Sequence, residues 1–138
     1  MAEAFAAEAT IDRPVQEVFA RLTDWPRAAE WMPGVESVRA DGDVLTVHAR
    51  GKDRTSRITA YEPGRSVTLT SVRGGVRADY AYMCEPTGTG TRVSLRADCV
   101  TSGAWKLVGG MIRGAIRKAD SGQLESFKRV VEAGARDA

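Results

Sequence analysis

The chain has 138 residues, of which 43% are hydrophobic and 28% charged, and its formal net charge is +2. This length and composition predict one globular domain, residues 1–138, which needs no disulfide or metal to stabilise its core. Basic and acidic residues are interspersed, so the charge pattern gives no support to nucleic-acid binding. The sequence contains no stretch of 18 apolar residues, so no membrane span is predicted.

The N-terminal sequence MAEAFAAEAT lacks the basic-then-apolar pattern of an export signal, so a cytoplasmic location is expected. The single histidine, His48, has no partner histidine, and neither cysteine belongs to a C-x-x-C pair. We therefore expect neither a metal site nor another cofactor.

The first elements are a strand and two short helices. Residues 5–11 alternate as a strand does. Asp12 is a candidate helix cap and Pro14 suits a first helical turn, so a helix is expected to follow, with Val18 and Leu22 on its buried face. A second short helix is predicted at residues 27–31, before Pro33-Gly34.

The middle of the chain predicts β structure. Six candidate strands cover residues 35–39, 44–50, 54–61, 66–72, 76–85 and 91–100. Turn-forming pairs such as Asp41-Gly42, Pro63-Gly64 and Gly74-Gly75 separate them. Short connections between successive strands favour an antiparallel meander with one face on a core.

The last two of these strands also predict their register. A turn at residues 87–90 places Glu85 opposite Arg92 and Cys99 opposite Ala78. Cys84 and Cys99 then lie ~20 Å apart along the ladder, too far for a disulfide. We expect two free, buried thiols.

Residues 104–133 have helical periodicity, and an apolar stripe runs along one side from Trp105 to Val130. Four glycines interrupt it: Gly109, Gly110, Gly114 and Gly122. Either they thin the helix where a molecule must fit beside it, or the chain breaks near Gly109-Gly110 and the helix proper starts at Met111. A sheet of seven strands needs a second layer, so the predicted fold is α+β, a curved antiparallel sheet gripping one long C-terminal helix.

Four segments carry a family resemblance: IDRPVQEVFARLTDWPRAAEWMPGV (residues 11–35), ITAYEPGRSVTL (58–69), YMCEPTGTGTRVSL (82–95) and LESFKRVVE (124–132). With the order of elements, they resemble the SRPBCC or START-like superfamily of helix-grip proteins. Its bacterial branch includes proteins labelled polyketide cyclase/dehydrase and lipid transport. The resemblance is specific for fold and covers nearly the whole chain.

The resemblance implies a cavity between sheet and long helix that holds a small or medium hydrophobic ligand, such as a lipid or a polyketide. Members of the superfamily include binders, enzymes and partners of other proteins, and fold does not decide among these. The first hypothesis is a ligand binder, monomeric or homodimeric. The second is an enzyme of the polyketide cyclase/dehydratase kind, and the third a protein-interaction module.

Six residues are candidates for contact with such a ligand: Tyr80, Tyr82, Trp31, Met32, Trp105 and Met111. The tyrosines share the inward parity of their strand, and a buried hydroxyl needs a partner. Trp31 and Met32 lie on the segment that borders the cavity mouth in similar folds, and Trp105 and Met111 flank the helix glycines. For each of them, ordinary core packing is the competing interpretation.

Acid–base catalysis requires a carboxylate or histidine that faces inward, and none is found. Asp79 and Asp98 have the outward parity, and His48 is expected to face water. Asp120 lies at the margin of the helix stripe and is the one acidic residue that this pattern brings near the interior. A solvated helix edge is the competing interpretation, and whether the protein catalyses a reaction stays open.

Overall fold

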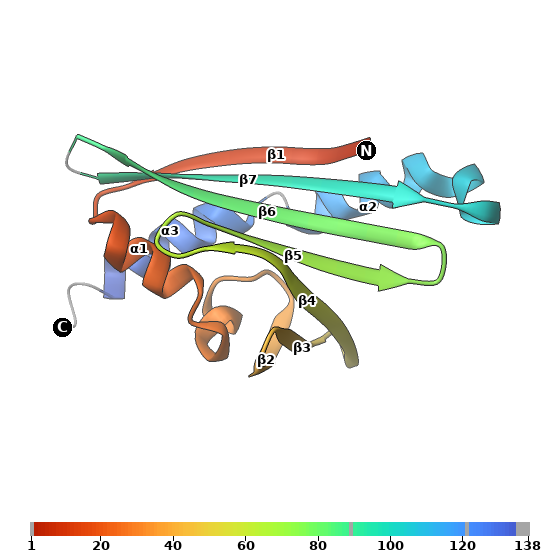
Figure 1. Ribbon diagram of the computed structural model, residues 1–138, viewed down its shortest axis with the longest axis horizontal. Helices are drawn as coiled ribbons and strands as arrows, with labels where there is room; N and C mark the ends of the chain where they lie inside the picture. The colour runs from red at the N-terminus through yellow and green to blue at the C-terminus, as the bar shows by residue number, and fades with distance from the viewer. Residues whose placement is uncertain (1, 89, 121, 135–138) are drawn as a thin grey trace.

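The computed structural model describes residues 2–88, 90–120 and 122–134. Within these residues, one antiparallel sheet of seven strands has the order β1-β7-β6-β5-β4-β3-β2. The strands are β1 (Ala2–Ile11), β2 (Val35–Asp41), β3 (Val44–Ala49), β4 (Lys52–Glu62), β5 (Ser66–Arg73), β6 (Val76–Thr87) and β7 (Gly90–Thr101). Figure 1 shows the sheet in front of two C-terminal helices, with β4 turning steeply away from the long strands β6 and β7.

The helices occupy the predicted places in the chain. Between β1 and β2 lie α1 (Val15–Leu22) and the 3₁₀ helix η1 (Trp25–Glu30). After β7 come the 3₁₀ helix η2 (Gly103–Val108), then α2 (Gly109–Asp120) and α3 (Gln123–Gly134). This is the predicted α+β helix-grip architecture, a curved sheet with helices on its inner face.

The β-sheet register agrees with the prediction from sequence. Glu85 pairs with Arg92 and Ala78 pairs with Cys99. Both cysteines are free and buried, as expected. The turn between β6 and β7 therefore lies where its threonines and glycines predicted it, and this turn fixes the pairing of the two longest strands.

Two local predictions about the helices are wrong. The C-terminal stretch is not one helix: η2 ends and α2 begins at Gly109, which agrees with the predicted alternative of a break near Gly109-Gly110, but the separate start of α3 after Gly122 was not predicted. Glycine is a poor helix former, which accounts for the break beside Gly122. Asp12 does not cap α1. Pro14 takes the N-cap position without a side-chain hydrogen bond, and the Asp12 amide donates to Glu132 instead.

The inner face of the sheet and the last helix form the core. The inward positions of β7 hold four buried apolar side chains, and α3 supplies three more; these are Val93, Leu95, Ala97, Cys99, Leu124, Phe127 and Val131. α2 contributes less, because Gly109 is its only buried residue among those whose burial the structure describes. The helical layer therefore covers one end of the inner face more completely than the other.

Candidate ligand-binding site

Tyr82 lies at the centre of the inner face of β6. It is 2% exposed, and its hydroxyl donates a hydrogen bond to Oε1 of Gln123 at 2.5 Å. Gln123 is the first residue of α3 and is 4% exposed. A buried amide is costly without partners, so this contact joins sheet and helix at a defined position.

Trp31 follows η1 and packs against Tyr82 on β6 and Phe127 on α3. Its ring meets Phe127 edge-on, with centroids 4.9 Å apart, and Tyr82 at 6.3 Å. Trp31 is buried, yet among the described residues its Nε1 has no hydrogen-bond partner. An indole N–H without an acceptor is unusual in a core, because burial normally comes with a hydrogen bond.

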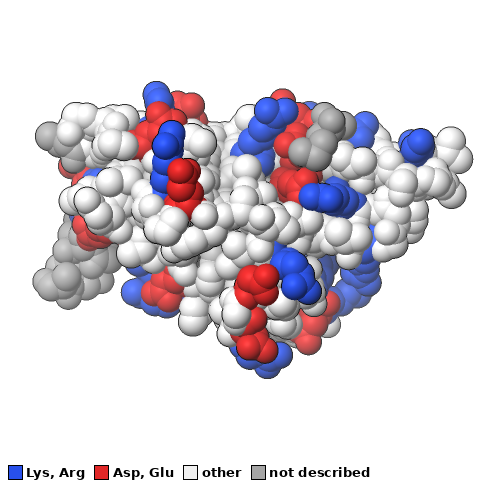
Figure 2. Space-filling model, in the orientation of Figure 1, with Lys and Arg blue, Asp and Glu red and all other residues white. Residues whose placement is uncertain are grey.

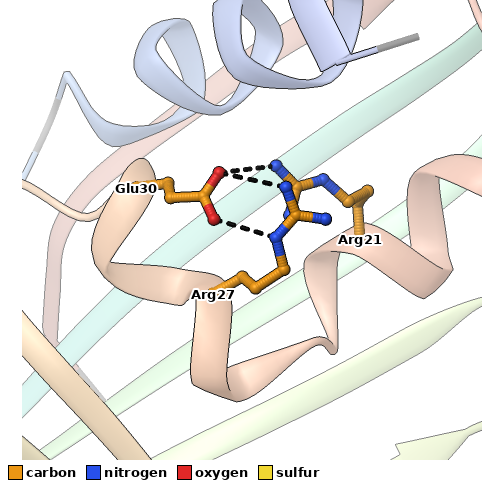
Figure 3. Close-up of polar contacts among 3 residues, drawn as sticks. All are labelled: Arg21, Arg27 and Glu30. Carbon is orange, nitrogen blue, oxygen red and sulfur yellow. Dashed lines mark hydrogen bonds and ion pairs between the residues drawn. The ribbon is translucent and has the colours of Figure 1, made fainter. Parts of the chain in front are cut away.

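An ion-pair cluster holds the segment that carries Trp31. Nη2 of Arg21, on α1, lies 3.1 Å from Oε1 of Glu30, and Nε of Arg27 lies 2.8 Å from Oε2 (Figure 3). The hydrogen bond from Arg27, with support from Arg21, lowers the pKa of the Glu30 carboxyl. One carboxylate thus ties η1 to α1 immediately before Trp31.

The side chains of Tyr80 and Met32 are only partly buried. Tyr80 packs edge-on against Phe5, with centroids 6.4 Å apart. Both residues belong to a set of partly buried apolar side chains around the core, which also includes Val35, Val47, Ile58 and Ile116. We call this set the inner rim. These side chains are only partly buried, whereas Tyr82 is almost completely buried.

Trp105 and Met111 do not join this group. Both side chains are exposed, and the Trp105 indole lies against the β5–β6 hairpin, where a Cβ on Gly75 would stand 2.4 Å from Cδ1 of Trp105. Gly75 lies in the turn immediately before β6 and is seven residues from Tyr82, about 20 Å away along the strand direction. Of the helix glycines, Gly109 is closely packed and would place a Cβ 2.9 Å from Oγ1 of Thr101, whereas Gly114 has open space beside it.

The two outward aspartates have the predicted parity, but they are less solvated than expected. Asp79 and Asp98 face each other across β6 and β7, and both are buried. The Thr70 hydroxyl donates to Asp79 at 2.6 Å, and Nε of Arg77 and of Arg96 lies 3.4 Å from the nearer carboxylate. Each buried carboxylate therefore lies beside the guanidinium of a neighbouring arginine.

The remaining titratable candidates are His48 and Asp120. His48 lies on the outer face between Glu36 and Asp53, as expected for a surface histidine. The side chain of Asp120 lies outside the described residues. Within the described part of the chain, no group of three or more His, Cys, Asp or Glu residues is placed to hold a metal ion.

The sheet, the C-terminal helices and the partly buried inner rim define a helix-grip protein with a candidate ligand site on the inner face. The family model described as polyketide cyclase / dehydrase and lipid transport matches residues 2–132. The chain belongs to this family. A comparison with curated proteins gives no match.

Solved structures with the same fold include an aromatase/cyclase, Zhui, from Streptomyces sp. R1128. It is 18% identical, with a TM-score of 0.74 and coverage of 93% of this chain and 92% of that one. A START superfamily protein from Mycobacterium smegmatis is 10% identical, with a TM-score of 0.73 and coverage of 94% and 97%. The di-domain aromatase/cyclase StfQ is 14% identical, with a TM-score of 0.71, and the match covers 96% of this chain and 50% of StfQ.

Gln123 is the residue that sequence reasoning missed. A signal was present, because Gln123 stands four residues before Phe127 and so lies on the same helical face. A polar residue in an apolar stripe indicates a buried hydrogen bond. No described helix is long and apolar enough to cross a membrane.

Proposed function

We propose that the protein binds a small or medium hydrophobic molecule between the inner face of the sheet and its C-terminal helices. The observation that carries this proposal is the inner rim, a set of aromatic and aliphatic side chains that are only partly buried against the core. Such a surface is typical of small-molecule sites, which are mostly apolar with few polar groups. Membership of a family whose description includes lipid transport supports the proposal.

The buried indole of Trp31 supplies a polar contact for such a ligand. Its Nε1 lacks an acceptor among the described residues and belongs to the cluster with Tyr82 and Gln123. A carbonyl or hydroxyl oxygen on a bound molecule would satisfy it, so the preferred ligand is apolar and carries at least one acceptor oxygen.

A second candidate is an enzyme of the polyketide cyclase/dehydratase kind. The aromatase/cyclases among the structural neighbours favour it, and Tyr80 or Tyr82 would polarise or protonate a substrate carbonyl. Against it, the described inner-face positions of β5, β6 and β7 hold no carboxylate and no histidine to act as a base. Replacing both tyrosines with Phe separates the candidates, since a carrier keeps most of its affinity and an enzyme loses turnover.

Native mass spectrometry of the freshly expressed protein tests ligand binding, followed by mass spectrometry of a denatured extract. We expect a stoichiometric apolar adduct that contains oxygen. Val47→Trp should fill part of the inner rim and reduce the adduct, whereas Thr46→Trp, its neighbour on the outer face of β3, should not. A clean apo mass, with no thermal shift across lipids, polyketides and flavonoids, would contradict the proposal.

A further inference from the structure

Large apolar side chains gather on the surface at one end of the molecule. Leu107 is 90% exposed, Met111 74% and Trp105 47%. Trp105 rests on the β5–β6 hairpin, and Val72, at the end of β5, is also exposed. We call Trp105, Leu107 and Met111 the apolar tip. Single exposed apolar residues are ordinary, but a group of them indicates a contact surface.

The apolar tip does not form part of the core. η2 contains no buried residue, and Met111, in the first turn of α2, points to solvent. One turn further along, Ile116 packs against the core as part of the inner rim. The same short helical stretch therefore exposes apolar side chains at its start and borders the candidate ligand site at its end.

The charged residues in the segment that carries the apolar tip are all basic. From residue 103 to residue 118 the sequence contains Lys106, Arg113, Arg117 and Lys118, and it contains no acidic residue. The whole chain is nearly neutral, with a net charge of +2, so this excess of cations is local. Figure 2 shows the end of the molecule at the right as mainly white and blue, with the red side chains further in.

We propose that the apolar tip docks on the surface of an anionic lipid bilayer. Exposed Leu, Met and Trp side chains enter the boundary between headgroups and acyl chains, and the surrounding Lys and Arg side chains contact lipid phosphates. Trp is well suited to this position, since its ring is apolar and its N–H remains hydrated. Docking would also let an apolar ligand pass between the bilayer and the inner rim. This consequence rests on the proposed function, whereas the docking proposal itself does not rest on it.

Vesicle flotation of the ligand-free full chain provides the test. We expect binding to phosphatidylcholine vesicles that contain about 30% phosphatidylglycerol, weaker binding to pure phosphatidylcholine, and loss of binding at high salt. The double variant Leu107→Ser/Met111→Ser should bind at least about tenfold more weakly. Lys106→Gln/Lys118→Gln should weaken binding to the anionic vesicles alone. Met83→Ser, which removes an exposed methionine from β6, is the matched control and should bind as the wild type does.

Trp105 reports the contact directly. Trp25 and Trp31 are buried, whereas Trp105 is half exposed, so a blue shift of fluorescence on adding vesicles, absent in Trp105→Phe, assigns the contact to the apolar tip. No flotation with either vesicle would overturn the proposal. Self-association in light scattering that Leu107→Ser/Met111→Ser abolishes, without vesicle binding, would also overturn it and assign the surface to a second copy. Because no ligand is added, failure here leaves the adduct measurement on the inner rim unaffected.

Discussion

At the scale of single residues, His48 gives the most direct prediction. Its Nδ1 lies 2.7 Å from Asp53 and its Nε2 3.1 Å from Glu36. The hydrogen bond to Asp53, and then the charges of both carboxylates, raise the pKa of His48 above its ordinary value of 6.5. As the chain has one histidine, its NMR titration is unambiguous. Asp53→Asn should lower this pKa more than Glu36→Gln does.

The sign of the pH effect follows from the direction of this shift. The protonated ring is favoured in the folded state, so its contribution to stability is fully present below pH 6.5 and is lost as pH rises through the folded pKa. A His48 pKa at or below 6.5 in the folded wild type would contradict the ion-pair geometry.

The buried thiols predict low chemical reactivity. Burial raises the pKa of Cys84 to about 12 and also raises the pKa of Cys99. At pH 8 about one Cys84 thiol in ten thousand is then ionised, and the thiolate is the reactive form. We expect a disulfide reagent to modify neither cysteine quickly in the native protein and both in urea. Rapid native reaction of one equivalent would show that one strand opens locally.

The contact between Tyr82 and Gln123 predicts a measurable loss of stability. Tyr82→Phe leaves the Gln123 amide buried without this donor, which costs about 1–3 kcal/mol of unfolding free energy. Tyr80→Phe is the matched control, since Tyr80 is only partly buried. A double-mutant cycle with Gln123→Met, read by urea denaturation, isolates the pairwise term. A coupling energy near zero would mean that the hydrogen bond does not stabilise the fold.

Sequence reasoning recovered the facing of these residues but not their partners. The parity of β6 placed Tyr80 and Tyr82 inward, since side chains alternate along a strand. That Trp31 Nε1 lacks an acceptor depends on how η1 packs over the sheet, and no pattern in the sequence contains this information. The same holds for Asp79 and Asp98, whose outward parity did not predict that they would be buried.

At the scale of elements, Glu30 determines how η1 is attached. Glu30→Gln removes the negative charge that pairs with both Arg21 and Arg27. We therefore expect η1 to loosen and acrylamide to quench the fluorescence of Trp31 more strongly. The pKa of Glu30 is lowered in the folded state. Its stabilisation is therefore present above the ordinary pKa of 4.5 and is lost as pH falls through the folded value.

Acid denaturation provides the comparison. The wild type should lose stability on acidification more steeply than Glu30→Gln, in which this group no longer titrates. Glu62→Gln, at a more exposed pair with Arg65, is the control and should change the acid limb little. Identical acid limbs for Glu30→Gln and the wild type would show that the ion pairs of Glu30 do not stabilise the attachment of η1.

The strands and their register were predictable, whereas the helix boundaries were not. Turn residues and two-residue alternation act within a few positions, so the pairing of β6 and β7 follows from local sequence. The C-terminal region has helical periodicity throughout, but periodicity alone does not show where the helix breaks. The breaks lie at the 3₁₀ helix η2 and beside Gly122. A glycine in a helical pattern does not show whether tertiary contacts will keep the helix or break it.

At the scale of the whole molecule, the two ends of the helical layer differ in burial. α3 packs Leu124, Phe127 and Val131 into the core, whereas η2 buries nothing and the first turn of α2 exposes Met111. Local opening is easier where few apolar contacts would be lost. The described structure therefore predicts a gradient of stability along the C-terminal region, from a firm α3 to a weakly held η2.

Hydrogen exchange followed by mass spectrometry measures this gradient. Peptides from residues 103–112 should exchange at least about tenfold faster than peptides from residues 124–133 or from the centre of β6, because η2 opens without disturbing the core. Gly75→Ala should accelerate exchange in residues 103–112 alone, since its Cβ would meet both Trp105 and the Ser102 carbonyl oxygen. Anionic vesicles should slow exchange in that segment if the apolar tip docks on them. Equal protection of η2 and α3 would contradict the gradient and would mean that the exposed end is held by contacts other than those with the core.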